Sequence, residues 1–93
     1  KQKRRNTMLI KRIMVQLPGG LQARHTALFV HKAFSFKSNI LLAKDGKSAN
    51  AKCIMKVMEL AVKEGDEITL LTGGIDEHAA VRTLEEFLLT KHR

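Results

Sequence analysis

The sequence contains no tryptophan or tyrosine, and only one proline and one cysteine among its 93 residues. A single cysteine cannot form a disulfide within the chain, which agrees with a reducing compartment. No apolar run approaches the roughly 18 residues of a membrane-spanning helix, and no signal-peptide core stands near the N-terminus. We therefore expect a cytoplasmic protein with an aliphatic core, too short for two domains and not associated with a membrane.

The net charge of +8 is unevenly distributed. Four of the 17 basic side chains lie in residues 1–7, so residues 8–93 carry 13 basic and 9 acidic side chains, a net charge of +4. Such a segment is typical of a disordered basic tail or a vector-derived remnant, with Met8 as the natural start of a single domain over residues 8–93. A direct nucleic-acid-binding module is a disfavoured alternative, because exposed aromatic pairs and a recognised motif are missing.

Hydrophobic periodicity predicts the element order βαββαβα, without an internal repeat or linker. Asp45-Gly46 indicates a tight hairpin turn, because both positions tolerate positive φ. Strands mixed with helices in this order predict an α+β fold with helices packed on one face of a sheet. The expected strands cover residues 9–17, 39–44, 47–51 and 67–72, and the expected helices cover residues 23–34, residues 53–62 and the segment after Asp76.

Two helical stripes are predicted to face the core. The first helix is expected to bury Ala23, Ala27, Val30 and Phe34, and to place Arg24, Leu28 and His31 on another face. In the last helix, Asp76 is well placed to cap the N-terminus with its side chain. The buried stripe expected there consists of Ala80, Val81, Leu84, Phe87 and Leu88.

The run Gly20-Leu21-Gln22-Ala23-Arg24 resembles the Gly-Ile/Leu-His-Ala-Arg-Pro run of the HPr-like phosphocarrier family of the bacterial sugar phosphotransferase system. Residues 45–55, 65–71 and 73–77 match the same family, and Gln22 places the chain closest to its Crh branch, which also has glutamine at this position. The resemblance implies an HPr-like open-faced sandwich, with a four-stranded antiparallel sheet and three helices on one face.

The family's histidine takes phosphate from enzyme I and passes it to a sugar-specific IIA protein. Gln22 cannot replace it, because its amide nitrogen lone pair is delocalised into the carbonyl. A helix N-terminus with Arg24 would still attract an anion. His25, which stands where the family has proline, is the alternative acceptor, although a solvated or capping role is favoured. The histidines are too scattered for a metal site, and we expect neither metal nor cofactor.

Cys53 stands where the family has a serine that HPr kinase phosphorylates. A thiol differs from a hydroxyl in size and phosphoryl chemistry, so control by that kinase should be lost. We interpret Cys53 as a small, partly buried replacement for serine. A redox-active thiol beside Lys52 at a helix N-terminus is the functional alternative.

The family docks its partners through the first two helices. The matching residues here are Ala27, Leu28, His31, Ile54, Met55 and Met58, although helical spacing alone does not separate a docking surface from core. The chain is therefore predicted to be a non-enzymatic regulator that binds phosphotransferase-system proteins or the catabolite control protein, a transcriptional regulator. The alternative is a phosphocarrier that uses His25. Pro18-Gly19-Gly20 is a plausible hinge for the first-strand exchange by which Crh forms homodimers.

Overall fold

The computed structural model describes residues 8–91, and the prediction for residues 1–7 falls outside that range. The element order is βαββαβα, as predicted from the sequence. The strands are β1 (Leu9–Met14), β2 (Asn39–Lys44), β3 (Lys47–Asn50) and β4 (Glu67–Gly73). The helices are α1 (Ala23–Phe34), α2 (Ile54–Glu59) and α3 (Glu77–Leu88).

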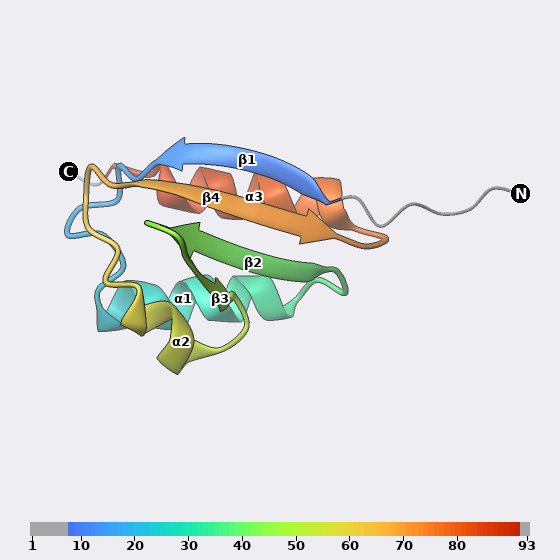
Figure 1. Ribbon diagram of the computed structural model, residues 1–93, viewed down its shortest axis with the longest axis horizontal. Helices are drawn as coiled ribbons and strands as arrows, with labels where there is room; N and C mark the ends of the chain where they lie inside the picture. Colours follow the sequence, from blue (N-terminus) through green and yellow to red (C-terminus); the bar gives the residue numbers. More distant parts are fainter. Residues whose placement is uncertain (1–7, 92–93) are drawn as a thin grey trace, which may run out of the picture.

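The four strands form one antiparallel sheet in the order β1-β4-β2-β3, so the first and last strands in the chain lie side by side. Asp45 and Gly46 join β2 to β3 with φ values of 51° and 80°, the pair of left-handed conformations that a type I′ hairpin turn requires. All three helices lie on one face of this sheet (Figure 1). The predicted open-faced sandwich is confirmed.

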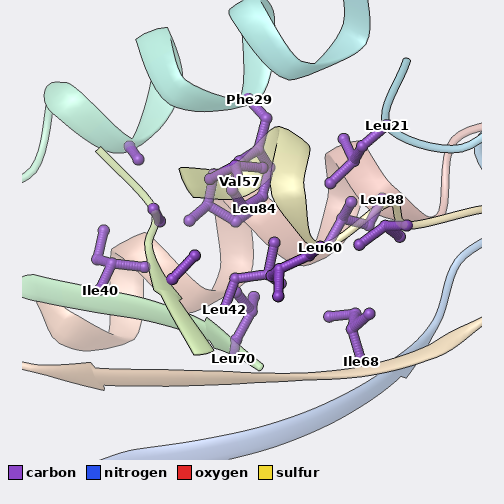
Figure 2. Packing of buried hydrophobic residues seen from close by; sticks show 14 of the residues in the cluster. Leu21, Phe29, Ile40, Leu42, Val57, Leu60, Ile68, Leu70, Leu84 and Leu88 are labelled. Atoms are coloured by element: carbon purple, nitrogen blue, oxygen red, sulfur yellow. The ribbon is translucent and has the colours of Figure 1, made fainter. Parts of the chain in front are cut away.

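The core lies between the sheet and the helices, where Leu42, Ile68 and Leu70 point toward Phe29 of α1 and Leu84 of α3 (Figure 2). In α3 the predicted stripe is confirmed, with three residues buried and two partly buried at its edge: Ala80, Leu84 and Leu88, then Val81 and Phe87. The core is mostly aliphatic, as the composition predicts. None of the described helices is long and apolar enough to cross a membrane.

The predicted core stripe of α1 is wrong except at Val30. The helix buries Thr26, Phe29, Val30 and Ala33, whereas Ala23, Ala27 and Phe34 are exposed. The apolar pattern does not reveal this buried stripe, because one of its residues, Thr26, is polar. Thr26 is fully buried, and its hydroxyl donates a hydrogen bond to the carbonyl oxygen of Leu21 at 2.8 Å. That hydrogen bond removes most of the cost of burying a hydroxyl. Helix α1 is therefore rotated about its axis relative to the prediction.

Asp76 stands at the N-cap position of α3, as predicted, but its side chain makes no cap hydrogen bond. Its carboxylate accepts hydrogen bonds from the backbone N–H of Lys37 at 2.8 Å and of Ser38 at 2.9 Å, and from the Ser38 hydroxyl. These hydrogen bonds, the Ser38 hydroxyl first, hold the pKa of Asp76 below its ordinary value. Asp76 thus ties the β4–α3 turn to the α1–β2 loop instead of capping its own helix.

Candidate functional site

Three segments meet at the end of the molecule where α1 begins and α3 ends: the β1–α1 loop, the end of α3, and the segment between α2 and β4 (Figure 1). After β1, the backbone N–H groups of Gln16 and Leu17 donate to the carbonyl oxygen of Leu88, at 2.9 and 3.1 Å. The N–H of Leu21 donates to the carbonyl oxygen of Val62, at 3.0 Å, in the segment between α2 and β4. The β1–α1 loop is therefore held on two sides by backbone hydrogen bonds.

Two glycines give this loop its shape. Gly20 has a φ of 69°, and a Cβ there would lie 2.5 Å from the carbonyl oxygen of Val62, so any side chain would force the loop away. Gly19 has a φ of 79°, and a Cβ there would lie 1.9 Å from Nε2 of Gln22. The Gln22 side chain is therefore folded back over Gly19. Gln22 occupies the N-cap position of α1 without a side-chain cap hydrogen bond.

Gln22 and Arg24 are both exposed at the start of α1. The first turn of this helix contains no acidic residue, so its positive end is not compensated from within the helix. Among the described residues, the ion pairs all involve basic side chains other than Arg24. The first-turn N–H groups and this guanidinium are the features that attract an anion. The side chain at the N-cap position itself is the carboxamide of Gln22.

His25 lies one turn deeper than Gln22 and is partly buried against α3. Its Nδ1 is 3.0 Å from the carbonyl oxygen of Gly20, and its ring meets the ring of Phe87 edge-on, with 6.3 Å between centroids. A carbonyl oxygen can only accept, so Nδ1 carries the proton and the neutral ring has its lone pair on Nε2. The ring is therefore only partly solvated, and its Nδ1 bonds to the carbonyl oxygen of the preceding loop.

Cys53 stands at the N-cap position of α2 and is partly buried, as predicted for a small replacement for serine. Helix α2 starts one residue later than predicted, because Asn50 to Lys52 form a turn closed by the Asn50 side chain, which accepts from the Lys52 N–H at 2.9 Å. It also ends earlier than predicted, at Glu59, and Ala61 has a φ of 52°, which is not helical. The Lys52 ammonium donates to the carbonyl oxygen of Phe36 at 2.7 Å. Lys52 therefore links the turn to the end of α1.

The outer surfaces of α1 and α2 contain six residues predicted to contact partners, and all six are exposed. Met55 is the most accessible of the large apolar side chains among them, at 70%. Adjacent exposed apolar side chains on neighbouring helices are typical of an interaction surface. We call this set the α1/α2 face: Ala27, Leu28, His31, Ile54, Met55 and Met58.

Glu64 belongs to the same end of the molecule, although sequence reasoning did not single it out. Its Oε1 accepts a hydrogen bond from the backbone N–H of Gly19 at 3.2 Å. The two residues are 45 positions apart in the chain, and no motif connects them. Only the fold places this carboxylate beside the loop that carries Gln22.

A sheet in the order β1-β4-β2-β3 with helices on one face defines a protein of the small open-faced sandwich class. The family model described as the PTS HPr component phosphorylation site matches residues 10–90. The chain belongs to the HPr family.

Relatives from both branches of the family are similar to this chain. The HPr-like protein Crh of Halalkalibacterium halodurans is 49% identical over 81 residues, which cover 87% of this chain and 96% of that protein. The crystal structure of the phosphocarrier protein HPr from Bacillus anthracis superposes with a TM-score of 0.87 at 46% identity, and covers 89% of this chain and 99% of that one. Crh of Bacillus subtilis, whose crystal structure is described as a swapped, intertwined dimer, has a TM-score of 0.70 at 47% identity, over 84% and 90% of the two chains.

Proposed function

We propose that this protein is a non-catalytic regulator of the HPr/Crh type, which binds partners through the α1/α2 face and carries phosphate at neither family site. The observation that carries the proposal is a complete family scaffold in which Gln22 and Cys53 occupy the two acceptor positions. Its partners are proteins of the phosphotransferase system or the catabolite control protein. The membership of the family supports this choice of partners.

The chemistry of the two positions supports the absence of phosphate. The Gln22 amide has no nitrogen lone pair available to attack phosphorus. The Cys53 thiol does not present the hydroxyl that a serine kinase uses. The resemblance to the family's motifs assigns its two acceptor positions to these residues, and both lie at N-cap positions, of α1 and α2. The scaffold around each position is therefore compatible with docking even though transfer is lost.

The alternative, a phosphocarrier that uses His25, has one observation in its favour. With Nδ1 bonded to the Gly20 carbonyl oxygen, Nε2 is the ring nitrogen with a lone pair. Against it, the ring is partly buried against Phe87, one helical turn from the exposed N-cap position. After incubation with phosphoenolpyruvate and enzyme I, this alternative predicts an acid-labile phosphate on the wild type that His25→Ala abolishes.

The docking half of the proposal is tested by titrating isotope-labelled protein with purified enzyme I and, separately, with the catabolite control protein. We expect amide shifts centred on the α1/α2 face, and weaker binding by Met55→Ala, because truncating a central exposed anchor typically costs about 1–2 kcal/mol, or roughly five- to thirtyfold in Kd. Met14→Ala is the matched control, since Met14 is similarly exposed, at 55%, but lies on β1. Equal binding by the two variants, or no binding to either partner, would contradict the proposal.

A homodimer formed by exchange of β1 is part of the same proposal. Within residues 8–91, strand β1 is at the edge of the sheet and pairs only with β4, so a second copy can supply the same pairing. The dimer of Bacillus subtilis Crh supports this route. Light scattering over a concentration series should show a dimer fraction that rises with concentration and exchanges slowly. A monomer at every concentration would remove this part of the proposal.

A further inference from the structure

We propose that Glu64 determines specificity at the start of α1: its carboxylate repels a phosphoryl group from the place where the family binds one. The inference rests on the proposed function and deepens it, because it adds a second obstacle to phosphate besides the missing histidine. It concerns a residue that lies outside the motif and reaches the loop only through the fold.

The geometry brings the Glu64 carboxylate close to the Gln22 side chain. Glu64 Oε1 lies 3.2 Å from the backbone nitrogen of Gly19, and a Cβ on the same Gly19 would lie 1.9 Å from Nε2 of Gln22. Ordinary bond lengths and angles then place the two side-chain atoms within about 8 Å of each other. A phosphoryl group carried at this N-cap position would share that neighbourhood with the carboxylate.

The carboxylate acts here in two ways. Its Oε1 already accepts a hydrogen bond from the backbone N–H of Gly19, a donor in the loop beside the start of α1. Its charge also lacks an ion-pair partner within residues 8–91, where the acidic members of the ion pairs are Glu85, Glu67 and Asp66. An uncompensated negative charge opposes a second anion nearby.

The size of the effect follows from the separation. A phosphoryl group with two negative charges about 8 Å from a carboxylate in water is disfavoured about sixfold without salt, and about twofold at 0.1 M salt. Near 1 M salt the Debye length falls to about 3 Å, and the factor falls to about 1.1. Salt dependence therefore separates charge repulsion from a change in structure.

The experiment starts from Gln22→His, which supplies an acceptor, and compares it with Gln22→His/Glu64→Gln. Glutamine keeps an oxygen that can accept from the Gly19 N–H, so the change removes the charge and preserves the loop. Gln22→His/Glu86→Gln is the matched control, since Glu86 is exposed on α3 and its substitution changes the net charge equally. The measurement is the single-turnover rate of phosphate transfer from phosphorylated enzyme I, at saturating enzyme I, in low and high salt.

We expect the Glu64→Gln background to accelerate transfer about two- to sixfold at low salt and less than about 1.2-fold near 1 M salt, with Glu86→Gln leaving the rate unchanged. Equal rates with and without the Glu64 carboxylate, or failure of both variants to take phosphate, would overturn the inference. Uptake of phosphate by the wild-type chain would instead overturn the proposed function, so the two failures are distinguishable.

A second measurement does not depend on enzyme I. A nearby carboxylate favours the charged form of an imidazole, so the pKa of the imidazole introduced by Gln22→His should be lower when Glu64→Gln is also present. Titration of its ring proton resonances by NMR reports this difference directly. An identical titration midpoint in the two backgrounds would show that the carboxylate does not act on this position, and the inference would fail.

Discussion

Replacing Thr26 with valine should destabilise the protein, although valine is the more apolar residue and nearly the same size. Thr26 is fully buried, and its hydroxyl donates to the Leu21 carbonyl oxygen at 2.8 Å. The valine variant loses this hydrogen bond and leaves a carbonyl inside the protein without it. A buried polar group left unsatisfied costs about 1–3 kcal/mol, and the gain from one extra apolar methyl offsets less than about 1 kcal/mol.

We therefore expect Thr26→Val to lower the free energy of unfolding by about 1–2 kcal/mol. Urea denaturation followed by circular dichroism measures this change, with the slope m checked to remain constant. Thr26→Ser is the matched comparison, because it keeps the hydroxyl and loses one buried methyl, which costs about 1 kcal/mol. In hydrogen exchange, the Leu21 amide, which donates to the Val62 carbonyl oxygen, should lose protection in the valine variant and keep it in the serine variant.

A valine variant at least as stable as the wild type would refute the reasoning. It would mean that the Thr26 hydroxyl does not hold the Leu21 carbonyl. The rotation of α1 relative to the apolar pattern would then need another cause. A serine variant that is markedly less stable than the valine variant would lead to the same conclusion.

Three further predictions concern other parts of the fold. Gly20→Ala should cost at least about 2 kcal/mol of stability in urea denaturation, because its Cβ would meet Val62 in a left-handed backbone; a neutral substitution contradicts this. Because the folded-state pKa of Asp76 lies below its ordinary value of 3.8, its contribution to stability is present above that value and is lost as the pH falls through the lower, folded-state pKa. Asp76→Asn should flatten the acid side of the urea-midpoint profile, and an unchanged profile would exclude this role. Cys53→Ser should gain one phosphate by intact mass with HPr kinase and ATP, whereas equal phosphorylation of the wild type would show that the thiol is not the obstacle.

Most of the fold could be predicted from local patterns. The hairpin at Asp45-Gly46 was predictable because its two left-handed residues are encoded locally, and the α3 stripe because each buried position is apolar. The buried stripe of α1 was not predictable, since a buried threonine whose hydroxyl bonds to a carbonyl looks like a surface residue in the sequence. Phe34, which the pattern assigns to the core, is instead 66% exposed.

The candidate site could be predicted only in part. The sequence motifs contain three of its residues directly, namely Gln22, Arg24 and Cys53. Each lies at or near the start of a helix, where side chains are exposed or only partly buried. The role of His25 depends on a carbonyl five residues earlier and on Phe87 far along the chain. Glu64 reaches Gly19 only because the segment after α2 packs against the β1–α1 loop. Such long-range contacts leave no local pattern.

The most direct test of the central claim is the intact mass of the wild-type chain after incubation with phosphoenolpyruvate and enzyme I, measured without acid. Gln22→His in the same reaction serves as the positive control, since it supplies the nitrogen nucleophile at the family position. The account predicts that the wild-type mass does not change. A stoichiometric gain of one phosphate by the wild type would contradict it.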